Sequence, residues 1–186
     1  MRAAVLYERK TPLKVEDVDL DAPKAGEVLV KVVANGVCHS DYSVIHGVLP
    51  LPLPVVLGHE GAGVVAEVGP GVTLVKPGDH VVLSAVPYCG HCYYCSFGEF
   101  VQCENTVVVM GRGTLADGTS RLRKNGTVIH HMAGLSSMAQ YAVVAELACI
   151  KIPQEVPLQT ACLVGCGVIT GVGAAINTAN VALPEG

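Results

Sequence analysis

Short apolar runs rich in valine dominate the first half of the chain, and several of them alternate with polar residues. Alternation of this kind predicts strands with one face toward water, and the glycines and prolines between the runs indicate tight turns. The runs cover residues 3–7, 28–33, 55–57, 61–68 and 80–84. Many short strands joined by Gly/Pro turns are typical of a barrel or sandwich, so we expect a mainly β fold.

Helical patterns are few and short. We expect helices over residues 39–46 and 158–163 and in the Ala/Ile/Asn stretch after Cys166. No charged residue occurs from Val156 to Pro184, but the densest apolar part, residues 161–176, contains several glycines and is flanked by polar residues. Because a membrane span needs about 20 mostly apolar residues, this segment predicts a buried region and no membrane contact.

Composition limits the classes of protein that fit. A length of 186 residues with 51% hydrophobic and 15% charged residues supports one good core, not two domains, and excludes a disordered chain. The formal net charge is -4, and no basic cluster is longer than Arg121, Arg123 and Lys124, which we interpret as a solvated hairpin. Nucleic acid is therefore not expected as a partner. The N-terminus lacks the apolar core of a signal peptide, which predicts a cytoplasmic protein.

Four of the eight cysteines form the most specific pattern, in a lobe of about residues 88–104. They are spaced Cys89-x2-Cys92-x2-Cys95-x7-Cys103, in a loop with few hydrophobic anchors. Two residues between thiolates let adjacent side chains reach one tetrahedral ion, so a structural zinc would staple this lobe. An iron–sulfur cluster and disulfides are the alternatives. The ferredoxin pattern differs after the third cysteine, and disulfides need an oxidising compartment.

The other four cysteines are isolated in sequence. A lone cysteine is usually a small core residue, and this is our interpretation of Cys149 and Cys162. Cys38, His59 and Cys166 instead lie in glycine-flanked motifs on three distant segments. A catalytic zinc takes three protein ligands and leaves one position open, and two cysteines with one histidine are a set that occurs. These three residues would supply that set, and two thiolates would neutralise the charge of Zn2+.

Several motifs together resemble the zinc-dependent, medium-chain alcohol dehydrogenases. The resemblance is to their N-terminal GroES-like catalytic domain, a partly open β-barrel with a few short helices and a zinc-stapled lobe, and it covers nearly the whole chain. The stretch over residues 113–121 further resembles the branch of liver-type and glutathione-dependent formaldehyde-oxidising enzymes. The motifs are Gly36-Val-Cys38-His-Ser-Asp41, Gly58-His-Glu60-Gly-x-Gly63, Lys76-Pro-Gly-Asp79, the four-cysteine lobe, Ser137-Met-Ala-Gln-Tyr141 and Gly165-Cys-Gly-Val-Ile-Thr170-Gly.

The resemblance implies oxidation of alcohols, or reduction of aldehydes, by zinc-alkoxide formation and hydride transfer to NAD. It implies two zinc ions per chain. Cys38, His59 and Cys166 would hold the catalytic zinc, with Glu60 close behind it as a supporting residue or an alternative ligand, and the four-cysteine lobe would hold the structural zinc. The implied substrate is a small alcohol or aldehyde.

The resemblance also assigns roles around the catalytic zinc. Asp41 would hydrogen-bond the zinc-bound imidazole, which sets its tautomer and raises its basicity. Ser40 would bond the substrate oxygen and start a proton relay. His39 would meet the cofactor pyrophosphate, and Thr170 would touch the nicotinamide.

Two departures from the family pattern change what we expect of this chain. The relay histidine expected three residues after Ser40 is Ser43, and His46, one helical turn further on, is a candidate substitute base. A nucleotide-binding domain opening with a Gly-x-Gly-x-x-Gly turn is absent from residues 1–186, so the chain alone is expected to be inactive or very weakly active. The alternative hypothesis is a non-catalytic, zinc-binding GroES-like folding or interaction module.

Exposed apolar surface where a second domain would dock predicts association, and a homo-oligomer is one form it can take. Among the remaining histidines, we interpret His130 and His131 as surface residues in a turn between strands. We interpret His80 and His91 as loop or strand-end residues.

Overall fold

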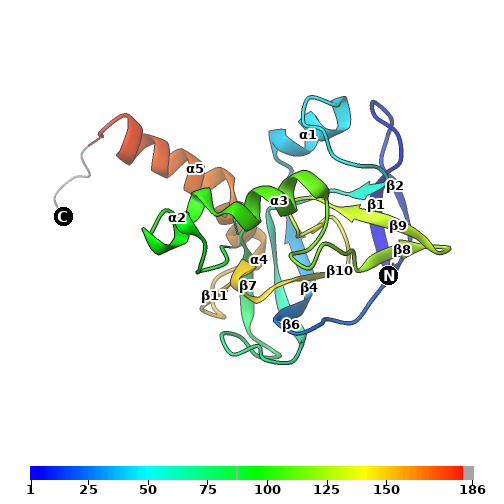
Figure 1. Ribbon diagram of the computed structural model, residues 1–186, viewed down its shortest axis with the longest axis horizontal. Coiled ribbons are helices and arrows are strands. Elements are labelled where there is room, and N and C mark those ends of the chain that lie inside the picture. The colour runs from blue at the N-terminus through cyan, green and yellow to red at the C-terminus, as the bar shows by residue number, and fades with distance from the viewer. Residues whose placement is uncertain (87, 182–186) are drawn as a thin grey trace.

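Two sheets form a partly open barrel in the computed structural model, which describes residues 1–86 and 88–181 (Figure 1). The first sheet has the strand order β2-β1-β5-β9-β8-β3, and the second has the order β10-β4-β6-β7-β11. Paired strands are antiparallel except β5 and β9, which are parallel. A bridge between Ala3 and Ala139 links the sheets, because Ala139 lies just before β10. The strands are β1 (Arg2–Leu6), β2 (Lys14–Asp17), β3 (Asp19–Leu20), β4 (Glu27–Asn35), β5 (Val55–Val56), β6 (Gly61–Val68), β7 (His80–Leu83), β8 (Leu122–Lys124), β9 (Thr127–His131), β10 (Tyr141–Ala145) and β11 (Cys149–Ile152).

Short helices lie outside the barrel, and Figure 1 shows α5 running away from the sheets toward the C-terminal end. The α-helices are α1 (His39–His46), α2 (Tyr93–Ser96), α3 (Glu104–Arg112), α4 (Leu158–Ala161) and α5 (Gly167–Gly173). Single turns of 3-10 helix cover Phe100–Gln102, Glu146–Ala148 and Cys162–Gly165, and a π-helical turn, Ala174–Thr178, continues α5. The mainly β fold predicted from the sequence is therefore confirmed.

The main core lies under the second sheet, and strand periodicity explains its composition. On β4, Val28 and Val30 are fully buried, whereas Lys31 between its neighbours Val30 and Val32 faces water, as expected for side chains that alternate across a strand. Val81, Leu83 and Leu135 complete the same cluster from β7 and from the segment before β10. The valine-rich runs thus form strands because each one buries a continuous row of branched side chains.

Helix boundaries follow local signals in α1 but not in α3. α1 spans the predicted residues, begins with a capping box between Cys38 and Asp41, and ends at Gly47 in the left-handed conformation. α3 was not expected, because its Thr-Val-Val-Val run has low helix propensity. It begins directly after Cys103, one of the four lobe cysteines, and ends at Gly113, which has a φ of 64°.

Two sequence-based interpretations of polar residues are wrong. His130 and His131 lie in β9 rather than in a turn, and His131 is only 1% exposed. Arg121 is not part of a solvated hairpin, because its side chain is also 1% exposed. The buried guanidinium forms two hydrogen bonds with Glu27, of 2.9 and 2.5 Å, and one of 2.8 Å with Asp117. Arg123 and Lys124 do remain partly exposed.

Acid is expected to destabilise the fold through His131. Its Nε2 accepts a hydrogen bond from the backbone N–H of Arg121 at 3.2 Å, and burial, with the nearby charge of Arg121, lowers its pKa to about 3. The imidazole therefore stays neutral in the fold, but takes up a proton in the unfolded chain below about pH 6.5. Stability should fall as the pH drops below that value, by about 2–3 kcal/mol at pH 4.5.

Urea unfolding of the wild type and of His131→Gln across pH 7 to 4.5 measures this effect. Gln accepts the same backbone hydrogen bond but has no proton to gain, so its stability should depend less on pH. Parallel stability curves for the two proteins would contradict the prediction.

Within residues 1–86 and 88–181, no single helix is both long and apolar enough to cross a membrane. A bent pair, Leu158–Gly165 and Gly167–Thr178, passes together on length and composition, with 53° between its halves.

Candidate metal centres

Four side chains from three distant segments meet at one point of the fold. The ligand atoms of Cys38, His59, Glu60 and Cys166 all lie within 4.8 Å of one another. Cys38 precedes α1, His59 and Glu60 precede β6, and Cys166 precedes α5. His59 and Glu60 are buried, whereas the two cysteines are half-buried and their sulfurs lie 3.9 Å apart. The structure therefore brings together the three ligands that the sequence predicted, with Glu60 beside them.

The carboxylate of Asp41 contacts two of these residues, Cys38 and His59. One oxygen of its buried carboxylate accepts the N–H of Cys38 and the other accepts the N–H of Gly58, both at 2.9 Å. The second oxygen also lies 3.7 Å from Nδ1 of His59, which has no other hydrogen-bond partner. A carboxylate held in this way orients the imidazole and leaves its second nitrogen free to bind a metal.

Glu60 connects the cluster to α5. Its Oε1 accepts the N–H of Gly167 at 3.0 Å, which positions the residue directly after Cys166. Its Oε2 sits against Gly36, where an added Cβ would lie only 2.1 Å away. Glycine at position 36 is therefore required for Glu60 to reach the cluster.

The pKa values of the two cysteine thiols shift in opposite directions. Burial acts to raise the pKa of Cys38, but hydrogen bonds from Ser40 and His59 outweigh it and lower that pKa. Burial, together with Cys38 and Glu60, raises the pKa of Cys166 to about 11. A thiolate at Cys38 thus disfavours ionisation of Cys166. A divalent ion bound between the two sulfurs would instead favour the thiolate form of both. Two sulfurs, an imidazole and a carboxylate are donors that fit zinc.

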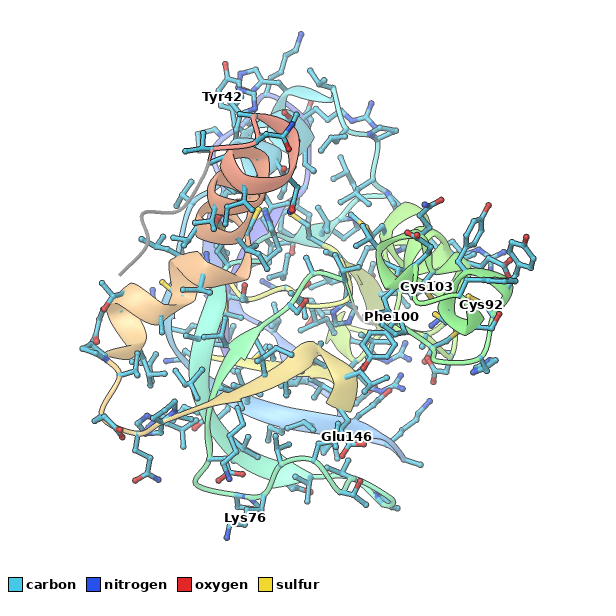
Figure 2. The ribbon with its side chains drawn as sticks, turned by 90° about the vertical axis from the view of Figure 1, so that its left-hand side faces the viewer. Tyr42, Lys76, Cys92, Phe100, Cys103 and Glu146 are labelled. Carbon is cyan, nitrogen blue, oxygen red and sulfur yellow. The ribbon has the colours of Figure 1, made fainter. Side chains whose placement is uncertain are left out.

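The second cluster consists of the four lobe cysteines. Their sulfurs all lie within 4.8 Å of one another, and all eight cysteines of the chain are free thiols in the structure. Cys103 is fully buried and is the residue before α3, and Cys92 is the residue before α2. Figure 2 shows Cys92, Cys103 and Phe100 together in the lobe, away from Tyr42 on α1. Four sulfurs at this spacing suit a tetrahedral metal centre.

Backbone N–H groups stabilise a negative charge on one sulfur of this lobe. Burial acts to raise the pKa of Cys103, but N–H groups of Thr106, Cys89 and Asn105 outweigh it and lower that pKa to about 6. The backbone nitrogen of Cys89 lies 3.2 Å from the sulfur of Cys103. Burial and the neighbouring sulfurs raise the pKa of Cys95 to about 11. As in the first cluster, the sulfurs cannot all ionise without a cation, which fits the donor set to a metal ion.

The other predicted site residues lie on α1 and α5. Ser40 places its Oγ 3.7 Å from the sulfur of Cys38, and His39 is exposed with Nδ1 3.3 Å from Oγ of Ser43. Thr170 is exposed one turn into α5, and its N–H donates to the carbonyl of Cys166 at 2.9 Å. His39, Ser40 and Thr170 therefore each follow a cysteine of the first cluster closely in the sequence.

His46, the candidate substitute base, is held at the other end of α1. Its ring stacks on Tyr42 with centroids 3.9 Å apart, and its Nδ1 lies 3.1 Å from the carbonyl of Tyr42. No contact in the described structure links His46 to Ser40. The stack gives its imidazole a local partner instead.

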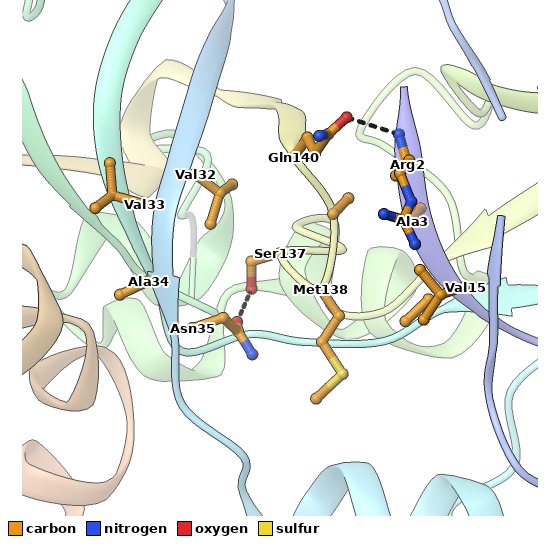
Figure 3. A pocket seen from close by; sticks show the side chains of 12 residues that line it. Arg2, Ala3, Val15, Val32, Val33, Ala34, Asn35, Ser137, Met138 and Gln140 are labelled. Atoms are coloured by element: carbon orange, nitrogen blue, oxygen red, sulfur yellow. Dashed lines mark hydrogen bonds between the residues drawn. The ribbon is translucent and has the colours of Figure 1, made fainter. Parts of the chain in front are cut away.

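A groove elsewhere in the fold is separate from both cysteine clusters. A groove of about 440 Å³ runs between β1 and β4 and is lined by Arg2, Val15, Val33 and Met138, among others (Figure 3). Its Ser137 hydroxyl already donates to Asn35 at 2.5 Å. None of its lining residues belongs to either cysteine cluster. The chemistry of the side chains therefore locates the site.

Comparison with known proteins agrees with this geometry. The family described as Alcohol dehydrogenase GroES-like domain matches residues 24–154, more than half of the chain. The chain belongs to the zinc alcohol dehydrogenase family. Within it, residues 24–154 match the GroES-like domain, the part of the family that the resemblance implied.

Three relatives of this alcohol dehydrogenase domain illustrate the match. Alcohol dehydrogenase class-3 of Drosophila melanogaster is 47% identical over 181 residues, covering 97% of this chain and 48% of its own length. The crystal structure of an alcohol dehydrogenase zinc-binding domain protein from Burkholderia ambifaria is 44% identical, with a TM-score of 0.90 over 97% of this chain and 49% of that one. Benzyl alcohol dehydrogenase from Acinetobacter calcoaceticus is 39% identical, with a TM-score of 0.86 over 95% and 47%. The chain thus spans about half the length of these relatives.

Sequence reasoning placed Glu60 beside the predicted zinc but did not predict its contact with α5, and it missed the part that Arg121 has in the fold. Glu60 acts on α5 through the N–H of Gly167, a contact between segments more than 100 positions apart. Arg121 ties Glu27, at the start of β4, to Asp117 in the turn before β8. The Gly-rich motif around Glu60 signals close packing, but nothing near Arg121 in sequence distinguishes it from Arg123.

Proposed function

We propose that this chain is the metal-holding catalytic half of an alcohol dehydrogenase, which oxidises small alcohols or reduces aldehydes with a nicotinamide cofactor. The observation that carries the proposal is the convergence of the Cys38, His59, Glu60 and Cys166 ligand atoms within 4.8 Å. Cys38, His59 and Cys166 would bind the catalytic zinc and leave one position open for substrate. The four lobe cysteines would bind a structural zinc.

The protein residues around the cluster have distinct roles in this proposal. A zinc ion bound here supplies a Lewis acid that polarises an alcohol or aldehyde oxygen. Asp41 fixes the orientation and tautomer of His59 through its contacts with Cys38, Gly58 and Nδ1. Glu60 is a positioning residue, because it holds the backbone beside Cys166.

Proton transfer would start at Ser40. Its hydroxyl lies beside Cys38 on the first turn of α1, where it can take the proton of a substrate hydroxyl. Ser43 occupies the place of the relay histidine, and its Oγ contacts Nδ1 of the exposed His39. Proton release would pass to solvent from this end of the helix without a dedicated imidazole base.

The nicotinamide cofactor would lie across the exposed parts of α1 and α5. His39 would meet the pyrophosphate, and Thr170, one turn beyond Cys166, would touch the nicotinamide ring. The relatives are about twice as long as this chain, so the remaining cofactor contacts would come from a second, nucleotide-binding half. Hydride transfer therefore requires that half.

Metal analysis tests the first part of the proposal. We expect about two zinc ions per chain, and Cys38→Ser and Cys92→Ser should each lose one of them. A single ion that disappears with Cys92→Ser but survives Cys38→Ser would leave only the lobe site and contradict the catalytic assignment. Absorption near 400 nm would indicate iron and sulfide in the lobe instead of zinc.

Activity requires a second experiment. The chain should be fused to the nucleotide-binding half of the Drosophila relative and assayed with NAD and benzyl alcohol or a short alcohol. We expect activity from the fusion, none detectable from the chain alone, and a loss of about 100-fold or more in the Ser40→Ala fusion. A folded fusion that binds two zinc ions but shows no activity would favour the non-catalytic module.

A further inference from the structure

The two loops that carry Cys38 and His59 meet the second sheet at the same place. β4 ends at Asn35, three residues before Cys38. β6 begins at Gly61, two residues after His59, and Gly61 is paired with Asn35 across the two strands. Ser137, in the segment just before β10, is buried against this point, because a Cβ added at Gly61 would lie only 2.7 Å from the Cβ of Ser137.

The backbone of this segment holds the loop of His59. The N–H of Ser137 donates to the carbonyl of Gly58 at 3.0 Å. The next N–H, of Met138, donates to the carbonyl of Leu57, also at 3.0 Å. A Cβ added at Gly58 would lie 2.5 Å from the backbone nitrogen of Met138, so the two backbones are in direct contact. The path of the chain into His59 therefore depends on where residues 137 and 138 lie.

The side chain of Ser137 reaches the other loop. Its Oγ donates to Oδ1 of Asn35 at 2.5 Å, and Figure 3 shows this contact. Nδ2 of the same amide donates to the carbonyl of Gly36 at 2.5 Å. The N–H of Gly36 in turn donates to the carbonyl of Glu60 at 2.9 Å. The peptide groups that lead into Cys38 are thus hydrogen-bonded to a chain of contacts that starts at the Ser137 hydroxyl.

The polar character of this contact matters more than its volume. A buried hydroxyl is costly unless it is hydrogen-bonded, and hydrogen bonds in the interior hold their partners in one arrangement. The Asn35 amide uses its oxygen toward Ser137 and its nitrogen toward Gly36, so a single orientation of the side chain satisfies both. An apolar residue of similar size could fill the space but could not select that orientation.

We propose that Ser137 is a positioning residue for the metal cluster, which ties the loop of Cys38 to the loop of His59. Its backbone N–H holds Gly58, and its hydroxyl holds the other loop through Asn35. Gly58 is thereby fixed at its carbonyl by Ser137 and at its N–H by Asp41. The inference rests on the proposed function, because it requires a metal ion bound at this cluster.

Zinc affinity measured separately for the two clusters tests the proposal. In a chelator competition on the zinc-loaded chain, Cys38→Ser identifies the ion of the first cluster by its loss. Ser137→Ala should weaken the binding of that ion by about 10-fold, the lower end of the range for residues behind metal ligands. The ion of the four lobe cysteines should keep its affinity. Asn35→Ala combined with Ser137→Ala should lose no more than Asn35→Ala alone, because the hydroxyl acts through the amide.

Ser136→Ala is the matched control. Ser136 is a neighbouring serine that is 2% exposed, and its hydroxyl donates to the carbonyl of Val56 on β5 at 2.9 Å. Its loss removes a buried hydroxyl that does not serve the metal loops, so stability can fall while both zinc affinities stay unchanged. With cobalt in place of zinc, the visible bands that Cys38→Ser abolishes report the geometry of the first cluster. These bands should shift in Ser137→Ala and not in Ser136→Ala.

The possible outcomes separate the positioning role from the proposed function. A wild type that binds no ion at the Cys38 cluster would overturn both. An ion bound there with the same affinity and the same cobalt bands in Ser137→Ala would overturn the positioning role alone. Equal losses in Ser136→Ala, or equal losses at both clusters, would show a general loss of stability and overturn it too. Multiplicative losses in the double variant would refute the route through Asn35.

Discussion

Cys103→Ser is expected to release one metal ion per chain and to unfold the lobe from Tyr88 to the end of α3. The Cys103 sulfur is fully buried, accepts backbone N–H groups, and lies at the N-terminus of α3. The lobe has few other anchors, because Tyr93, Phe97 and Val101 are largely exposed. At a free zinc concentration 1,000 times the dissociation constant, the bound ion contributes about 4 kcal/mol of stability, which the variant would lose.

Metal content, thermal unfolding and hydrogen exchange of the lobe amides measure this prediction. The barrel and the cluster around Cys38 should keep their metal ion, because they do not depend on the lobe sulfurs. Cys149→Ser is a matched control: Cys149 is buried on β11 outside both clusters, so its loss can cost stability but should not change metal content. Unchanged metal content in Cys103→Ser would contradict the structural-zinc assignment.

Arg121→Met should destabilise the barrel by about 3–5 kcal/mol. The guanidinium is buried and binds Glu27 through two nitrogens, so its removal leaves the Glu27 carboxylate, which is itself buried, without its countercharge. Asp117 loses a partner too, but retains Lys24 at 2.9 Å. The effect should be large because Arg121 links the start of β4 in one sheet to the segment entering β8 in the other.

Chemical denaturation of Arg121→Met and of two reference variants measures the effect. Arg123→Met removes a neighbouring arginine whose ion pair with Asp21, at 3.5 Å, is about half exposed, and should cost no more than about 1 kcal/mol. The double variant Arg121→Met with Glu27→Gln should recover part of the loss, since neither buried charge is then left alone. Equal costs for Arg121→Met and Arg123→Met would show that the buried pair is not important for stability.

Much of the fold follows from local pattern, and its exceptions have physical causes. Valine alternation predicts β4, β6 and β7, because a strand that buries one face has to repeat every two residues. The same reasoning fails for α3, whose β-branched run becomes helical once Cys103 and Gly113 anchor its ends. It also fails for His131, since alternation along β9 does not say which face of the strand is covered.

The candidate site divides in the same way between local and distant information. Cys38, His59, Cys166 and the four lobe cysteines can be recognised in the sequence, because metal ligands are restricted to a few residue types and their motifs carry the glycines that close packing needs. Their mutual distances depend on how β4, β6 and α5 pack. The bracing by Asp41 and Glu60 likewise depends on backbone N–H groups that lie far apart along the chain.

The sequence by itself determines the chemistry that this protein can hold: two sets of sulfur-rich ligands, one GroES-like barrel and a final segment without charge. Only the tertiary structure decides which polar groups become buried partners, as Arg121 does for Glu27, and which apolar residues remain uncovered, as Val172 does on α5. The physical reason is that burial is a property of what packs against a residue. For Arg121 the deciding surface belongs to a distant segment, whereas no described segment covers Val172.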